Sequence, residues 1–310
     1  MIPQMFNDAA VAAALPLDRL IDYMESGLTI PINAPLRMAI GGDHGRELLI
    51  MPAVSDRFAG IKMLTVVPAN TIENRPINGG LFALFDATTG AALATMDAGE
   101  LTARRTAAVS AIASRRLARS DAATLLLLGT GHIAPYLAEA HAAVLPLESI
   151  AIWGRRGDRT AACVEAVKSR LPGLHIQGVD DLEPAMRNAD VVTAATRSRD
   201  PLIRGEWLRE GTHVDLVGGY RPDMREIDDV GMLRGSIYVD TREGVLAEAG
   251  DLRSPIERGV IDPSAILGDL AVLLGGAGRV DAREITVFKS VGSAMSDLIA
   301  AQMVWETAGG

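Results

Sequence analysis

The pattern of hydrophobic and polar positions divides the chain into stretches of different periodicity. Residues 1–28 follow a helical pattern that is interrupted at Pro16, a residue accepted at the first position of a helix. Short apolar or alternating runs fill residues 36–96, with turn residues such as Asn78-Gly79-Gly80 between them, and this pattern predicts an antiparallel sheet. Residues 100–119 then predict one long helix rich in Ala and Arg.

Strand and helix patterns alternate beyond residue 120. The apolar run Leu125–Leu128 ends at Gly129-Thr130-Gly131, a helical pattern follows from near His132 to Val144, and a second apolar run covers Ile150–Trp153. A strand, glycine turn, helix and strand within about thirty residues form the unit that binds dinucleotides. The alternation continues to residue 285, so we predict an α/β protein with a doubly wound parallel (Rossmann) sheet.

The closing helical stretch, residues 293–305, suggests how the two patterns are divided into domains. A last helix commonly packs back on the first part of a chain. We therefore predict a dinucleotide-binding Rossmann domain over residues 120–285. Residues 1–119 together with 286–310 would form a second, α+β domain for substrate binding and dimerisation.

The glycine turn has the chemistry that a pyrophosphate requires. Gly129 permits a tight turn after the strand, Gly131 lets a phosphate approach the backbone, and Ala134 fits where helix and strand pack closely. The helix N-terminus behind the turn offers N–H groups and a partial positive charge. The motif alone is common, and a glycine turn without a ligand is the alternative; the flanking strand and helix favour dinucleotide binding.

Composition and charge exclude several classes of function. The chain has 310 residues, is 48% hydrophobic and has a formal net charge of −9 without a Lys/Arg run, so we expect no nucleic-acid partner. The single Cys163 cannot form an internal disulfide, and the five histidines lack metal-ligand spacing, so we expect no metal. The apolar run Ala9–Leu15 is too short to span a membrane, and we expect a soluble cytoplasmic protein.

Basic residues in the first part of the chain suggest an anion site, although each has a simpler explanation. Lys62 interrupts an apolar strand, and alternation alone favours the solvated face of the sheet over a site. Arg104 and Arg105 lie in the first turns of a helix, where a cation is unfavourable to the dipole unless an anion is bound there. Surface arginines paired with Glu100 are the alternative, and Arg37 at the start of the sheet has no evident local partner.

Several segments together resemble the ornithine cyclodeaminase/mu-crystallin family over nearly the whole length. These segments are Met51-Pro52-Ala53, Gly60-Ile61-Lys62, Glu100 to Ala108 (ELTARRTAA), Gly129-Thr130-Gly131 and Phe288 to Gly292 (FKSVG). The resemblance implies that Arg37, Lys62 and Arg105 hold the carboxylate and α-nitrogen of a substrate, with Lys62 and Arg105 as catalytic residues. It also places Gly292 in the substrate site and implies a homodimer whose antiparallel sheets meet.

Two departures from the cyclodeaminase pattern decide between activities. The aspartate that follows Gly-Gly in cyclodeaminases is Tyr220 here, and a glutamate that contacts the ornithine side chain is Leu49. A phenol gives up its proton far less readily than a carboxylic acid, so tyrosine is a poor replacement for a carboxylate base. Both changes remove negative charge that a second amino group of the substrate would need.

The segment Asp215–Glu226 is similar to that of family members that reduce Δ1-pyrroline-2-carboxylate to proline. We therefore predict an NAD(P)H-dependent reductase of a small cyclic ketimine carboxylate, an oxidoreductase acting on C=N. Its small-molecule partner would be a cyclic imino acid or amino acid. Ornithine cyclodeaminase, a lyase that recycles bound NAD, is the runner-up. A non-enzymatic mu-crystallin-like binding protein is the third possibility, and the presence of Lys62 and Arg105 argues against it.

The cofactor is predicted to be NADPH, with NADH possible. The second strand ends at Trp153 without an acidic residue for the ribose 2′-hydroxyl, and Arg155 and Arg156 follow, which suit a 2′-phosphate. Both arginines could instead be solvated in a turn. The residues expected to contact the cofactor are Gly129, Thr130, Gly131, His132, Ile133, Arg155, Arg156, Thr196, Val217 and Gly218.

Overall fold

The structure, a computed structural model, describes residues 2–71 and 75–308 and divides the chain into two compact units. The first comprises Met1–Thr106 with Gly292–Gly310, and the second is Ala107–Val291. The sequence placed these boundaries near residues 119 and 285 instead. The observed boundaries differ from the predicted ones for two reasons. The strand Ile285–Lys289 hydrogen-bonds within the parallel sheet, and the second half of the helix Ala98–Leu117 belongs to the same unit as that sheet.

The first unit is built on a six-stranded sheet in the order β1-β6-β5-β4-β3-β2. Strands β2 to β6 pair antiparallel, as the sequence predicted, while β1 pairs parallel with β6. Strand β1 lies within a stretch that was expected to be helical, and with three residues it is too short to show a period of two. The strands are β1 (Gln4–Phe6), β2 (Met38–Gly41), β3 (Glu47–Val54), β4 (Phe58–Val66), β5 (Asn78–Asp86) and β6 (Ala92–Asp97).

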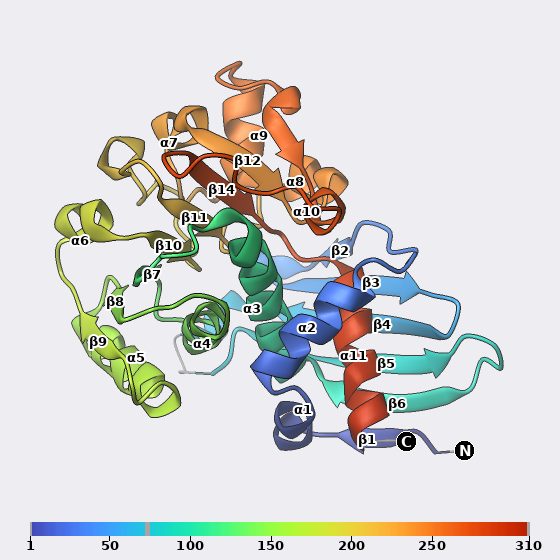
Figure 1. The fold of residues 1–310 in the computed structure, drawn as a ribbon. Helices are drawn as coiled ribbons and strands as arrows, with labels where there is room; N and C mark the ends of the chain where they lie inside the picture. Colours follow the sequence, from blue (N-terminus) through green and yellow to red (C-terminus); the bar gives the residue numbers. More distant parts are fainter. Residues whose placement is uncertain (1, 72–74, 309–310) are drawn as a thin grey trace. The chain divides into compact units, whose positions relative to one another are not determined.

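Helix α11 (Ala294–Ala308) covers one face of this sheet, packing across β3, β4 and β5 (Figure 1). Helices α1 (Asp8–Ala14) and α2 (Leu17–Gly27) pack against α11, and α3 (Ala98–Leu117) follows β6. Strand alternation places Met51, Phe82 and Leu84 on the covered face, where they are almost fully buried. Burying side chains of this size contributes roughly 1.5–3 kcal/mol each, which fixes the register of the sheet against the helix.

The second unit contains an eight-stranded parallel sheet in the order β13-β12-β14-β11-β10-β7-β8-β9 (Figure 1). The strand order reverses between β7 and β10, which makes the doubly wound fold that the sequence predicted. The strands are β7 (Thr124–Leu128), β8 (Ser149–Trp153), β9 (His175–Gly178), β10 (Val191–Ala194), β11 (His213–Leu216), β12 (Gly235–Val239), β13 (Ile266–Gly268) and β14 (Ile285–Lys289).

The helices of the second unit follow its strands as crossover connections. They are α4 (Ala134–Val144), α5 (Gly157–Arg170), α6 (Leu182–Asn188), α7 (Asp229–Arg234), α8 (Arg242–Glu248), α9 (Gly250–Glu257) and α10 (Leu270–Leu274). The sequence pattern missed α7, α9, α10 and β13, which have three to eight residues each, too few for a clear period. In the described residues, no helix is both long and apolar enough to cross a membrane.

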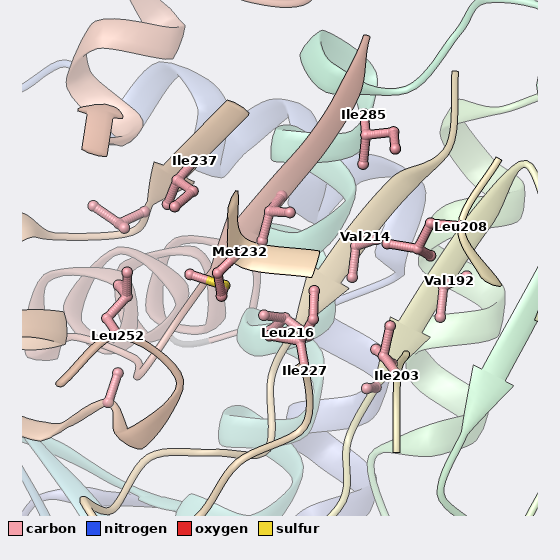
Figure 2. Packing of buried hydrophobic residues seen from close by; sticks show 14 of the residues in the cluster. Val192, Ile203, Leu208, Val214, Leu216, Ile227, Met232, Ile237, Leu252 and Ile285 are labelled. Carbon is pink, nitrogen blue, oxygen red and sulfur yellow. The ribbon is translucent and has the colours of Figure 1, made fainter. Parts of the chain in front are cut away.

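The core of the second unit lies between the parallel strands and the segments after β10 and β11 (Figure 2). Val192 and Leu216 from the sheet meet Ile203 and Ile227 from the connecting segments, and all four are fully buried. This apolar packing fixes the backbone just beyond the carboxyl ends of two strands, where ligands bind in doubly wound folds.

Candidate functional site

A buried cluster of charged side chains lies in the first unit. The Lys62 Nζ on β4 is 2.8 Å from an Asp297 carboxylate oxygen, and the Arg105 Nε on α3 donates to Asp297 Oδ1 at 2.7 Å. Lys62 is 1% exposed, Arg105 5% and Asp297 0%. Buried charges of this kind are stable only when they are paired, so Asp297 offsets the cost of burying two cations.

The local sequence explains why these residues meet. Lys62 lies on the helix-covered face of β4 together with Gly60, which has no side chain. Alternation alone favoured the solvated face for Lys62, and that expectation is wrong. Asp297 is in the first turn of α11, where a carboxylate is favourable to the helix dipole. The sequence patterns did not single out Asp297, although it is the one charged residue between Ala294 and Trp305, and that is a usable signal.

The surroundings shift the proton affinities of both partners. Burial lowers the pKa of Lys62 from 10.5 to about 7; Asp297 acts against this shift, and Arg105 and Arg37 add to it. Burial alone would raise the pKa of Asp297, but Arg105 and Lys62 outweigh it and hold that pKa below its ordinary value. The cluster therefore combines a carboxylate that stays ionised with an amine that exchanges its proton near neutral pH.

Arg37 and Gly292 adjoin this cluster in the first unit. The half-buried Arg37 donates from Nη2 to the Gly292 carbonyl oxygen at 3.0 Å. Gly292 has φ +81°, and a Cβ placed on it would lie 2.8 Å from Arg105 Nη1. The four residues predicted to meet a substrate, Arg37, Lys62, Arg105 and Gly292, are thus grouped around Asp297.

Replacing Gly292 with alanine should displace the Arg105 guanidinium and raise the KM for a carboxylate substrate about tenfold to a hundredfold, as small misplacements of binding groups do. Gly90→Ala is the matched control, because Gly90 has φ +73° and a methyl group there would have nothing within 4 Å. Both variants carry the left-handed strain of about 1–2 kcal/mol, so thermal melting should report similar losses. Steady-state kinetics in which both variants behave alike would contradict the displacement of Arg105.

Arg104 and Arg105 have different surroundings although they are neighbours on α3. Arg104 donates to Glu100 Oε1 at 2.6 Å and to the Leu15 carbonyl oxygen at 2.9 Å. The pairing with Glu100 that was the simpler explanation for both arginines therefore holds for Arg104, which is nevertheless buried. Arg105 points instead into the charged cluster with Asp297.

The glycine turn of the second unit has the geometry expected of a phosphate-binding loop. Gly129 has φ +109°, and a Cβ on it would come within 2.6 Å of the Ala195 carbonyl oxygen, so a side chain is excluded there. A Cβ on Gly131 would have nothing within 4 Å, which leaves the backbone open to a ligand. Helix α4 begins at Ala134, two residues later than predicted, so His132 and Ile133 lie in the turn before it.

The segment after β8 packs close to that turn. A Cβ on Gly154 would be 2.7 Å from Thr130 Cγ2, so the glycine allows the two segments to approach each other. Arg155 and Arg156 are exposed beyond it, and Arg156 makes two hydrogen bonds with Asp158, at 3.1 and 2.6 Å. Of the two arginines predicted to meet a 2′-phosphate, Arg156 would first have to leave Asp158.

The segments after β10 and β11 are joined by a buried carboxylate. Glu226 accepts hydrogen bonds from the Thr196 N–H at 2.6 Å, the Thr196 hydroxyl at 2.8 Å and the Gly218 N–H at 2.7 Å. Burial raises the pKa of Glu226 to about 7, with Lys289 acting against this and Asp251 adding to it. Thr196 and Gly218, predicted to contact the cofactor, are thus held by a residue that the sequence patterns did not single out. Val217, also predicted to contact the cofactor, donates its N–H to the Ala194 carbonyl oxygen at 2.8 Å.

Glu226 gave only a weak signal in the sequence, because acidic residues are common in connecting segments. Its position is fixed in turn by Asp251, whose Oδ1 accepts from the Glu226 N–H at 2.6 Å and whose Oδ2 is 3.2 Å from Lys289 Nζ. Asp251 and Lys289 come from α9 and β14, far apart in the sequence. Among the described residues, no group of His, Cys, Asp or Glu side chains has an arrangement that could hold a metal.

The doubly wound sheet with its open glycine turn in the second unit and the buried charged cluster in the first unit define a class of two-unit dinucleotide-binding proteins. The model of the ornithine cyclodeaminase/mu-crystallin family matches residues 3–310. The chain therefore belongs to the ornithine cyclodeaminase/mu-crystallin family, as the sequence motifs predicted.

Three proteins show which members of this family the chain is similar to. A Δ1-pyrroline-2-carboxylate reductase of Paracoccus denitrificans is 34% identical, over 97% of this chain and 96% of the relative. The structure of the Thermococcus litoralis Δ1-pyrroline-2-carboxylate reductase in complex with NADH and L-proline is 32% identical, with a TM-score of 0.95 over 98% of this chain and 97% of that one. An archaeal alanine dehydrogenase dimer with bound NAD is 27% identical, with a TM-score of 0.93 over 99% and 96% of the two chains.

Proposed function

We propose that the protein is an NAD(P)H-dependent reductase of a small cyclic ketimine carboxylate, of the type that converts Δ1-pyrroline-2-carboxylate to proline. The observation that carries this proposal is the buried cluster of Lys62, Arg105 and Asp297, with Arg37 beside it. It combines guanidinium groups that suit a carboxylate with an amine that can give a proton near neutral pH. The relatives named as Δ1-pyrroline-2-carboxylate reductases support the same assignment.

The chain's residues take distinct parts in this reaction. Arg37 and Arg105 bind the substrate carboxylate, which places the imine carbon and nitrogen in a fixed orientation. A dihydronicotinamide, when bound, would supply the hydride for the imine carbon, and the π electron pair of C=N would pass to nitrogen. Lys62 gives its Nζ proton to that nitrogen, and the product is a secondary amine.

Two positions favour reduction over deamination of a diamino acid. Leu49 is 7% exposed on the helix-covered face of β3, and it offers an ammonium group no counter-charge. Tyr220 packs against the apolar core of the second unit, where a cyclodeaminase would have an aspartate. A buried second amine without a carboxylate partner is strongly disfavoured, so a monocarboxylate with an apolar body fits these side chains better.

The test is a comparison of two reactions with the purified protein. Oxidation of NADPH and of NADH is followed by the loss of their absorbance with Δ1-pyrroline-2-carboxylate, and ammonia release is measured with L-ornithine and NAD. We expect rapid oxidation of reduced cofactor with the ketimine and little ammonia from ornithine. Robust ornithine deamination would overturn the assignment in favour of a cyclodeaminase, and tight cofactor binding without either reaction would favour a binding protein.

For the cofactor we propose a preference for NADPH over NADH, because Arg155 and Arg156 can form charge-assisted hydrogen bonds with a 2′-phosphate. Both arginines are exposed, and exposure weakens such bonds, so we expect a preference of about tenfold to a few hundredfold. Because Arg156 is held by Asp158, Arg155→Ser should reduce the preference more than Arg156→Ser. The exposed Arg159, in the first turn of α5, gives the control variant Arg159→Ser. The measurement is kcat/KM for both cofactors. A preference that neither Arg155→Ser nor Arg156→Ser alters would show that these arginines do not bind the 2′-phosphate.

We also propose a homodimer in which the sheet of the first unit packs against its counterpart in a second copy. The face of this sheet opposite α11 carries apolar side chains on β2, β3, β4 and β5, and Met38, Ile40 and Leu81 are 59%, 48% and 39% exposed. Apolar side chains that form a contiguous exposed face mark an interaction surface. The archaeal alanine dehydrogenase, a dimer, supports this proposal.

A further inference from the structure

Asp297 lies at the centre of the charged cluster, and the proposed reaction assigns it no step. Its carboxylate is fully buried and contacts two cations from different elements, Lys62 on β4 and Arg105 on α3. One oxygen, Oδ1, accepts from both, and Oδ2 is also 2.8 Å from Lys62 Nζ. A carboxylate shared in this way fixes the positions of both cations at once.

We propose that Asp297 is a positioning residue that keeps Lys62 protonated and orients Arg105 for the substrate carboxylate. The proposal rests on the proposed function, because it assigns Lys62 the proton and Arg105 the carboxylate. Asp297 acts through these two side chains and exchanges no proton with the substrate.

The charge balance of the cluster explains the first half of this role. The ionisable groups that act on Lys62 are Asp297 from α11, Arg105 from α3 and Arg37 from the segment before β2. When Lys62 is protonated, Lys62, Arg105 and Arg37 are all cations, and Asp297 is the one anion among these four groups. Without Asp297, a buried lysine beside two guanidinium groups loses its proton well below neutral pH.

The geometry of Arg105 explains the second half. Asp297 engages the Nε of Arg105, so the guanidinium plane is fixed by a bond on one edge. The Nη groups are turned toward Gly292, where a Cβ would come within 2.8 Å of Nη1 and 2.9 Å of Nη2. An arginine held at Nε retains its Nη donors for a carboxylate, whereas an unheld arginine has many more orientations.

The chain offers a direct test, because Lys62, Lys168 and Lys289 are its three lysines. With lysine labelled with ¹³C at Cε, the full-length protein gives three signals whose pH titration is followed by NMR. Lys62 is assigned as the signal absent from Lys62→Arg. Asp297→Asn should lower the pH at which Lys62 titrates by about 1–3 pH units, the usual effect of removing an adjacent opposite charge. The signals of the exposed Lys168 and of Lys289 should stay unchanged.

Asp18→Asn is the matched control, since Asp18 is also in the first turn of a helix of this unit but is exposed. If Asp297→Asn does not fold, Asp297→Glu serves as a second variant. It keeps a carboxylate, so Lys62 should titrate at nearly the same pH as in the wild-type protein. A Lys62 that titrates near its ordinary 10.5 in the wild-type protein, or at the same pH with and without the Asp297 carboxylate, overturns the proposal.

Kinetics separate this role from a merely structural one. Protonated Lys62 is lost as pH rises through its pKa, so Asp297→Asn should lose ketimine reduction at a lower pH than the wild-type protein. The ratio of variant to wild-type kcat/KM should therefore fall between pH 5.5 and 7.5 by about tenfold or more. A uniform loss across this range contradicts the role. If the wild-type protein reduces no ketimine, the proposed function fails, but the NMR titration still tests the pairing of Asp297 with Lys62.

Discussion

Replacement of Arg105 with alanine should lower kcat/KM for the ketimine about 10²- to 10⁴-fold. Arg105 is 5% exposed, so the bonds that it would make to a substrate carboxylate are poorly screened by water. Two hydrogen bonds to a charged group contribute about 1.5–3 kcal/mol each, and every 1.4 kcal/mol corresponds to a factor of ten. The loss should be largest in KM, because the carboxylate is bound in both the ground state and the transition state.

Arg105→Lys should restore little of this loss, because a lysine cannot bond Asp297 and a substrate carboxylate with the same fixed fork of donors. Arg57→Ala is the control for removing a guanidinium: the Arg57 side chain is 73% exposed and pairs with Glu306 at 3.2 Å. Binding of NADPH, measured by its fluorescence, should be the same in all three variants. A loss of less than about fivefold in Arg105→Ala would show that Arg105 does not bind the carboxylate.

Periodicity and turn chemistry were sufficient to predict the main architecture. Strands β7 and β8 have five residues each, and the apolar runs that predicted them lie within one residue of the observed limits. The doubly wound fold and the family were confirmed. These features depend on local sequence, which is why a single chain was enough to find them.

Features that depend on contacts between distant segments could not be read in the same way. The place of β14 between β11 and β12 depends on pairing across the sheet, so the end of the Rossmann domain was set at residue 285, where this strand begins. Asp297 and Glu226 are informative because of what surrounds them. Asp297 contacts two cations, and Glu226 accepts from four backbone or hydroxyl donors. For Lys62 the local pattern was misleading, because alternation suggested a solvated face, whereas pairing with the distant Asp297 makes its burial possible.

Introducing a charge on the open face of the first unit's sheet should convert the proposed dimer into a monomer. Ile50 on β3 lies on this face, opposite Met38 on β2 and Met63 on β4 in the strand register. In an interface with two-fold symmetry, Ile50→Glu appears twice. Each unpaired buried carboxylate costs several kcal/mol, so the dissociation constant should rise by about 10³-fold or more.

Light scattering at micromolar concentration should give the wild-type protein twice its chain mass of 32.7 kDa, and Ile50→Glu the mass of one chain. Leu233→Glu is the matched control, because Leu233 is an apolar residue with 61% exposure on α7 in the other unit, and it should remain dimeric. A wild-type protein with the mass of one chain would remove the proposed dimer altogether. A dimeric Ile50→Glu would instead place the contact on another surface, because a carboxylate in the middle of this apolar sheet could not be buried without a partner.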